Sequence, residues 1–260
     1  MPSSTVHLIY FSPTGTTRTT VHAVAEGLAP EQTFDHDLTF AFDAQKHHLA
    51  DGIAVIGIPV YAGRVPVECL ERLSAYTAMD MPAILVSLYG NREFEDALVE
   101  LRDIVTTQGF KVVAAGAFIG EHSYSTPERP IAAGRPDAED VRFTKEFGKQ
   151  VAAKIARKDF STPAIDGNVP YKERVQFGGV APETNDDTCI LCGECAAACP
   201  VGVIKLANQV VTRAENCIMC TACVRACLPQ ARSFNHPLIE ERRTMLIKGC
   251  STPKAPRVFV

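Results

Sequence analysis

Short apolar segments alternate with amphipathic segments over the first 157 residues. Four apolar segments are bounded by turn residues, which is typical of strands buried in a parallel sheet; they are residues 5–11, 52–58, 81–88 and 111–119. Residues 33–38 are a weaker candidate for an outer strand. Helical spacing of apolar residues predicts helices between the strands, at residues 16–28, 66–75, 91–108 and 136–157. Alternating strands and helices predict an α/β fold with a doubly wound parallel five-stranded sheet.

The pattern changes after residue 157. Residues 158–187 are rich in proline, glycine and polar residues without clear periodicity, which is typical of a linker. A small cysteine-rich segment follows at 188–235, where VIKLANQVV predicts a hairpin that turns at residues 207–209. The tail at 236–260 mixes charged residues and prolines, and no pattern in it indicates a role. We therefore predict a large domain over 1–157, a linker, a small domain and a C-terminal tail.

Eight of the ten cysteines form an internal repeat, because CILCGECAAACP at 189–200 recurs as CIMCTACVRACLP at 217–229. Each copy has the spacing C-x2-C-x2-C-x3-C of bacterial ferredoxins, in which three thiolates bind one 4Fe–4S cluster and the fourth binds the other cluster. The two predicted ligand sets are Cys189, Cys192, Cys195 and Cys227, and Cys217, Cys220, Cys223 and Cys199. Zinc is the competing interpretation, but structural zinc sites pair separated C-x2–4-C motifs around one ion.

The second copy departs from the first after its last cysteine. Pro200 follows Cys199 directly, whereas Leu228 separates Cys227 from Pro229. The insertion leaves the ligand spacing intact and puts in doubt only the turn after the last cysteine. Two cysteines lie outside the repeat: Cys69 falls in a helical pattern and is expected to be a small core residue, and Cys250 is a lone thiol in the tail.

The loop SPTGTT at 12–17 follows the first predicted strand and precedes a predicted helix. It lacks the lysine of a G-x-x-x-x-G-K-[ST] loop and the glycines of a G-x-G-x-x-G dinucleotide site. Its hydroxyls, its backbone N–H groups and the helix N-terminus form a neutral cradle for one terminal phosphate. The alternative is that Ser12 and the threonines only cap the helix.

This loop resembles the FMN-phosphate loop of flavodoxins, whose pattern is Ser/Thr-x-Thr-Gly-x-Thr. For five strands the flavodoxin-like order is also the one we expect, and it places ligands beyond the carboxyl ends of the strands. The whole chain resembles a family of bacterial and archaeal proteins in which a flavodoxin-like domain is fused to a small α+β ferredoxin domain with two 4Fe–4S clusters. PVYAGRVP at 59–66 and YGNR at 89–92, both just beyond predicted strands, support the resemblance.

The resemblance implies that the protein binds FMN together with two 4Fe–4S clusters. The FMN phosphate would be bound by Ser12, Thr14, Gly15, Thr16 and Thr17. The isoalloxazine ring would be flanked by two loops, which comprise Pro59, Val60, Tyr61, Ala62, Gly63 and Arg64, and Tyr89, Gly90, Asn91 and Arg92. A weaker third contact is expected from His122, Ser123 and Tyr124.

Several of these side chains have an alternative interpretation. The chain has no tryptophan, so Tyr61 and Tyr89 are the available stacking rings, although each could be a half-buried surface aromatic. Arg64 and Arg92 are either solvated surface charges or positive charges beside the flavin, where they would favour its anionic reduced form. His122 is expected to be a loop histidine, not a catalytic one.

The net charge of −4 and the pI near 6.0 argue against a nucleic-acid partner. The amino terminus lacks a secretory pattern and no apolar segment is long enough to span a bilayer, so we expect a cytoplasmic protein. The leading interpretation is an electron-transfer protein that relays electrons between FMN, the clusters and external redox proteins. The alternatives are a flavin-dependent reductase of a quinone or similar acceptor, and a redox sensor controlled by the clusters.

Overall fold

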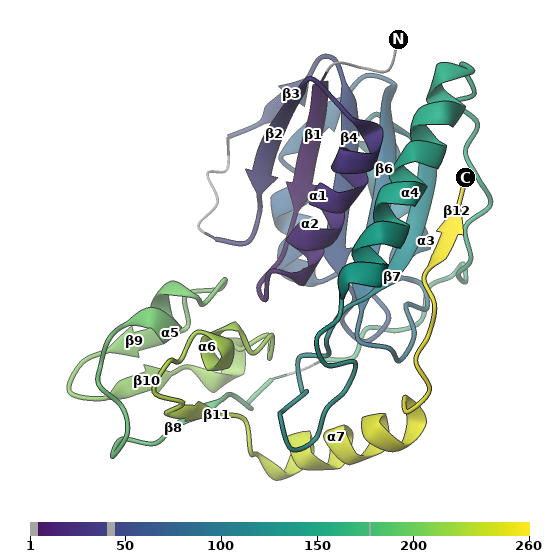
Figure 1. Ribbon diagram of the computed structural model, residues 1–260. Helices are drawn as coiled ribbons and strands as arrows, with labels where there is room; N and C mark the ends of the chain where they lie inside the picture. The colour runs from purple at the N-terminus through teal and green to yellow at the C-terminus, as the bar shows by residue number, and fades with distance from the viewer. Residues whose placement is uncertain (1–4, 41–44, 177) are drawn as a thin grey trace.

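A six-stranded sheet forms the centre of the larger domain in the computed structural model, which describes residues 5–40, 45–176 and 178–260 (Figure 1). Its order is β12-β7-β6-β4-β1-β2. Five of these strands pair in parallel; they are β1 (Thr5–Tyr10), β2 (Gln32–Asp37), β4 (Ile53–Pro59), β6 (Met81–Tyr89) and β7 (Phe110–Ile119). Numbered along the chain, the five run 2-1-3-4-5, which is the flavodoxin-like order. The predicted fold is confirmed.

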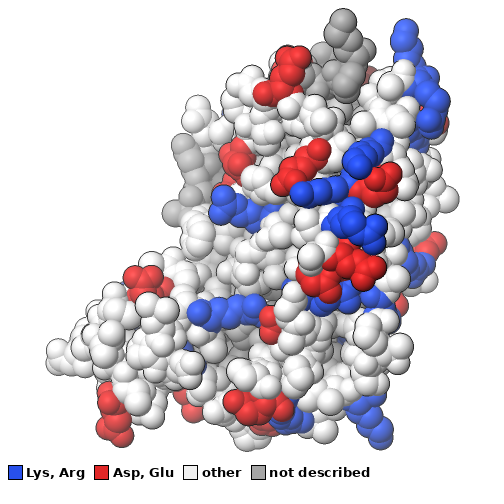
Figure 2. All heavy atoms as spheres, in the orientation of Figure 1, with Lys and Arg blue, Asp and Glu red and all other residues white. Residues whose placement is uncertain are grey.

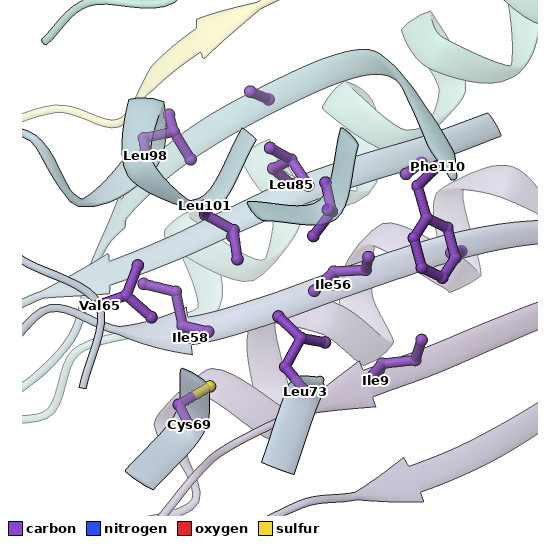
Figure 3. Packing of buried hydrophobic residues seen from close by; sticks show 14 of the residues in the cluster. Ile9, Ile56, Ile58, Val65, Cys69, Leu73, Leu85, Leu98, Leu101 and Phe110 are labelled. Carbon is purple, nitrogen blue, oxygen red and sulfur yellow. The ribbon is translucent and has the colours of Figure 1, made fainter. Parts of the chain in front are cut away.

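Helices cover both faces of this sheet. Figure 1 shows α1 (Thr16–Leu28) and α4 (Ala138–Ala156) in front of it, and α2 (Val67–Leu73) and α3 (Ala97–Thr107) behind it. Strand side chains alternate between the faces, so Leu8 packs in the cluster with α1 and α4 whereas Ile9 packs in the cluster with α2 and α3. Figure 3 shows the second cluster, which includes the fully buried Cys69. The prediction that Cys69 is a core residue is therefore confirmed.

The close approach of α1 and α4 depends on two glycines. A Cβ atom at Gly27 would lie 2.1 Å from the carbonyl oxygen of Lys145, and one at Gly148 would lie 2.4 Å from that of Val24. Backbone carbonyls cannot move away as a flexible side chain can, so only glycine fits at these positions. This contact fixes α1, and with it the loop that precedes α1.

The third helix begins later than its apolar pattern predicts. The pattern begins at residue 91, but α3 begins at Ala97. Asn91 and Glu95 have φ values of 63° and 46°, in the left-handed region that interrupts a right-handed helix. The intervening residues form a loop at the carboxyl end of β6. Two short strands that the pattern does not indicate, β3 (His47–Leu49) and β5 (Tyr76–Ala78), pair in parallel beside the main sheet.

The small domain contains two antiparallel strand pairs and two one-turn helices. The predicted hairpin is confirmed as β9 (Ile204–Leu206) and β10 (Val210–Thr212), and β8 (Glu183–Thr184) pairs with β11 (Arg232–Ser233). The helices are α5 (Glu194–Ala197) and α6 (Ala222–Arg225), and a 3-10 turn, η1, spans Ala214–Asn216. Each one-turn helix follows a left-handed residue at the same place in its cysteine run, Gly193 or Thr221, so the two runs have one local fold.

The C-terminal tail returns to the larger domain. Helix α7 (Pro237–Gly249) lies below the sheet in Figure 1, and β12 (Arg257–Phe259) then pairs antiparallel with β7 as the sixth strand. Asn91 holds the connection: its Nδ2 donates to the carbonyls of Cys250 and Thr252 at 2.8 and 2.9 Å, and its Oδ1 accepts from the N–H of Lys254 at 2.8 Å. The tail is therefore an integral part of the fold. No helix of the described residues has the length and apolar character needed to cross a bilayer.

Candidate cofactor sites

A cavity of about 340 Å³ lies at the carboxyl ends of the parallel strands. Its walls come from the loops after β1, β4, β6 and β7, from the segment around Lys172, from the second cysteine run and from α7. In a doubly wound sheet this end is where ligands bind. Segments that are separated by more than 200 residues along the chain therefore share one site.

The loop after β1 supplies one end of the cavity. Thr14, Thr16 and Thr17 line it, and Gly15 makes the turn with a φ of 82°. Ser12 has a different role, because its Oγ accepts a hydrogen bond from the N–H of Arg18 at 3.0 Å and so caps α1. The first-turn N–H groups of Thr16 and Thr17 have no carbonyl within the helix to donate to. Hydroxyls and free N–H groups thus meet at a helix N-terminus, where an anion is stabilised.

The loops after β4, β6 and β7 supply the middle of the cavity, and most of the residues expected beside a flavin ring line it: Pro59, Val60, Tyr61, Ala62, Tyr89, Gly90, Arg92, His122, Ser123 and Tyr124. Burial raises the pKa of Tyr61 well above its usual value. Burial, with Arg92 and Arg225 nearby, lowers the pKa of His122 to about 4. Both side chains are therefore neutral near pH 7. A Cβ atom at Gly90 would lie 2.4 Å from the ring of His122, so glycine is needed for the loops to meet.

Arg64 does not line the cavity, contrary to the expectation that it flanks the flavin. Its Nε and Nη2 donate to the two carboxylate oxygens of Glu100 at 2.8 and 2.9 Å, and its Nη1 donates to the carbonyl of Lys172. Gly63 and Asn91 also lie outside the lining, and Asn91 binds the tail instead. Arg92 lines the cavity, with its guanidinium paired to Glu95 at 2.8 Å.

The segment that follows α4 lies against α3, because two buried acids of the larger domain bind its backbone and side chains. Asp96 accepts from the N–H groups of Asn168 and Lys172 at 2.8 and 2.7 Å. Arg174 donates to the carbonyl of Val65 at 2.6 Å and pairs with Glu100. These contacts bring Lys172 and Val175 to the cavity. Nothing in the polar composition of 158–187 signals this role.

The eight repeated cysteines surround two further small cavities. Cys189, Cys192, Cys195 and Cys227 line the first, and Cys199, Cys217, Cys220 and Cys223 line the second. Each set combines three thiols of one run with the last thiol of the other, which is the crossed grouping that the spacing predicts. Among the described residues, no three histidine, cysteine or acidic side chains are grouped as ligands of a single metal ion.

Arg232 lies beside both sets of thiols. It is 4% exposed, it lines the first cavity, and its Nη2 lies 3.5 Å from the Sγ of Cys223 in the second set. Its Nη1 donates to Thr184 and Thr212 at 2.8 and 3.1 Å, whereas its Nε has no hydrogen-bond partner within the described part of the chain. A buried cation with an unpaired N–H suits a site that receives negative charge and sulfur acceptors.

The second cysteine run also reaches the large cavity. Ile218, between Cys217 and Cys220, lines both this cavity and that of the second thiol set, and Met219 lines the large cavity in the cluster against which Cys217 packs. The phenol of Tyr124 donates to the Sδ of Met219 at 3.9 Å, and Arg243 of α7 donates to the carbonyl of Tyr124 at 2.7 Å. The first run makes a separate contact with the larger domain, where Nη2 of Arg72 donates to the carbonyl of Pro200 at 2.7 Å. The two domains are therefore in contact.

Comparisons with known proteins gave one family match and a set of similar solved structures. Residues 181–228 match the family model of the 4Fe-4S dicluster domain. An archaeal flavodoxin aligns over 58% of this chain and 99% of its own, with 12% identity and a TM-score of 0.43. The flavodoxin of Megasphaera elsdenii aligns over 57% of this chain and 98% of its own, with 13% identity and a TM-score of 0.35.

An NAD(P)H:quinone oxidoreductase from Methanothermobacter marburgensis aligns over 59% of this chain and 98% of its own, with 13% identity and a TM-score of 0.38. No curated protein matches the chain. By its strand order and its family match, the chain combines a flavodoxin-like α/β domain with a 4Fe-4S dicluster domain.

Proposed function

We propose that this chain is a cytoplasmic electron-transfer protein that binds one FMN and two 4Fe–4S clusters and exchanges electrons with external redox proteins. FMN accepts one or two electrons and each cluster accepts one, so the combination can connect partners of different electron number. The observation that carries the proposal is the position of Ile218 and Met219. They belong to the second cysteine run and line the cavity that the phosphate-loop threonines also line.

The large cavity has the features that an FMN site needs. Its volume lies within the range of roughly 300–1,000 Å³ that is usual for ligand sites. Thr14, Thr16, Thr17 and the start of α1 would bind the phosphate through hydroxyl and N–H donors. Tyr61 and Tyr89 would present aromatic surface to the ring system, and Arg92 would supply positive charge near it.

The thiol sets have the features that two cubane clusters need. Each set offers four sulfur ligands around its own cavity, and the crossed grouping is that of two-cluster ferredoxins. Burial raises the pKa of the Cys220 thiol to about 12, so a bound cation is required to hold it as a thiolate. Arg232 adds a fixed positive charge between the sets, which would offset part of the negative charge of the ligands.

A reductase of a quinone or similar acceptor is less well supported. It would need room for a second organic molecule beside the flavin. The cavity of about 340 Å³ is close to the lower limit for a single ligand, and α7 and the second cysteine run form part of its wall. Close packing of the second run on the cavity favours transfer of electrons within the protein instead.

The cofactor content tests the proposal directly. Protein purified without oxygen is expected to contain about eight irons, eight acid-labile sulfides and one extractable FMN per chain. The measurement is metal and sulfide analysis with chromatography of the released flavin. FAD in place of FMN, or zinc in place of iron, would contradict the proposal. Intact clusters without any flavin would mean that the loop after β1 only caps its helix.

A further inference from the structure

The two cysteine runs present equivalent residues at their tips, but only one tip is covered. Ile190 and Leu191 stand where Ile218 and Met219 stand in the second run, 28 positions later. The second residue of each pair is left-handed, with φ values of 53° and 55°, so the tips have the same local shape. The covered tip of the second run therefore shows what kind of contact the exposed tip of the first run can make.

The exposure of the two tips is opposite. Met219 is 5% exposed and Ile218 is half-buried against the large cavity, whereas Ile190 and Leu191 are 69% and 43% exposed. Leu228, the residue inserted after Cys227, is 87% exposed. Ile190 and Leu191 line the cavity of the first thiol set, and Leu228 stands in the chain between Cys227 and Pro229, which line the same cavity. Exposed apolar side chains gathered at one place on a protein indicate an interaction surface.

The exposed charged residues that lie close to this tip along the chain are acidic. Glu183, Asp186, Asp187 and Glu194 are exposed, and there is no lysine or arginine between Arg174 and Lys205. Arg213 precedes the second run and Arg225 lies within it, and Arg225 lies 3.6 Å from Glu121 of the larger domain. Figure 2 shows the lobe of the small domain, at the lower left, as mostly uncharged, with acidic residues at its edges and basic atoms where it meets the larger domain. A partner with a basic rim would complement this surface.

We propose that Ile190, Leu191 and Leu228 form a docking surface for a redox protein that has a basic rim around the apolar entrance to its own electron-transfer centre. The inference rests on the proposed function and identifies the surface through which electrons enter or leave the protein. In each encounter one electron crosses, so one protein is oxidised and the other reduced by one electron, and no covalent bond changes. Three apolar residues with an acidic border make a small contact, which suits a transient electron-transfer complex.

The test uses the reduced holoprotein and oxidised mitochondrial cytochrome c, a small basic one-electron acceptor, as the probe. The rate of cytochrome c reduction is expected to fall as ionic strength rises, because the attraction is between exposed charges. Ile190→Gln and Leu228→Gln are each expected to lower the rate about five-fold, since central apolar contacts dominate such interfaces. Met79→Gln is the matched control, because Met79 is 78% exposed beside β5, outside the small domain.

Two further readouts locate the contact and separate the outcomes. Carbodiimide coupling of the two proteins is expected to link probe lysines to the peptide at 183–194. Rates with ferricyanide, a small acceptor, are expected to be the same for all variants. Unchanged cytochrome c rates in both glutamine variants, an equal loss in Met79→Gln, or cross-links elsewhere would overturn the docking surface. If the reduced protein failed to reduce ferricyanide as well, the proposed function itself would be wrong.

Discussion

Cys199→Ala is expected to remove the cluster bound by Cys217, Cys220 and Cys223, although Cys199 belongs to the other run. The physical reason is the crossed grouping, in which Cys199 lines the cavity of the second thiol set. Loss of one of four thiolate ligands leaves one iron without its protein ligand and destabilises the cluster. The variant should retain about four of its eight irons. Cys250→Ala, in the tail, is the control and should retain all of them.

Double variants make this prediction sharp. Cys199→Ala combined with Cys220→Ala removes two ligands of the same set, so iron content should fall no further than in either single variant. Cys199→Ala combined with Cys192→Ala damages both sets, and the protein should lose almost all of its iron. If the two results were exchanged, each run would bind its own cluster and the crossed assignment would be wrong. Iron and sulfide analysis of anaerobically purified protein is sufficient for the measurement.

Thr16→Asp is expected to weaken FMN binding by about 100-fold while the domain stays folded. Thr16 begins α1 and lines the large cavity. A carboxylate there would lie where the phosphate is proposed to bind, and two like charges in one cradle repel each other. A carboxylate in the first turn also stabilises a helix, so unfolding is not the expected cause. Fluorescence titration of the flavin-free protein with FMN measures the change in Kd.

Two controls separate the phosphate site from general damage. Thr19→Asp places the same charge one turn later, at an exposed residue that does not line the cavity, and should leave FMN affinity nearly unchanged. Riboflavin lacks the phosphate, so Thr16→Asp should bind it as well as the unmodified protein does. Equal loss of FMN and riboflavin affinity would mean that Thr16 acts on the fold of the site. Unchanged FMN affinity would place the phosphate elsewhere.

Local patterns were sufficient to predict the sheet and the thiol sets. The central strands are buried on both faces, so each appears as a continuous apolar segment. The spacing C-x2-C-x2-C-x3-C, which spans 11 residues in each run, is sufficient to predict how the thiols are grouped. Strand β12 could not be predicted in this way, because it has three residues and pairs with a strand more than 130 positions earlier. The late start of α3 depends on left-handed residues at 91 and 95, which apolar periodicity does not report.

The lining of the large cavity could likewise be predicted only where its residues directly follow a strand. The threonines after β1 and the tyrosines after β4 and β6 follow strands directly, so their place at the carboxyl edge can be predicted. Arg64 also follows a strand, but its guanidinium pairs with Glu100, which lies 36 positions away, and does not line the cavity. Three other residues reach the cavity only because distant segments fold back to it: Lys172 belongs to the segment that follows α4, and Met245 and Leu246 belong to α7 of the tail. No local motif marks these three residues.

The most direct test of the electron relay is the rate of electron transfer within one molecule. The experiment reduces the clusters of the anaerobic holoprotein in a rapid pulse and follows the flavin absorbance over a 100-fold dilution series. Because Ile218 lines both the large cavity and that of the second thiol set, the relay predicts a first-order rate that does not depend on protein concentration. A rate that falls in proportion to dilution would show transfer between molecules and would contradict the relay.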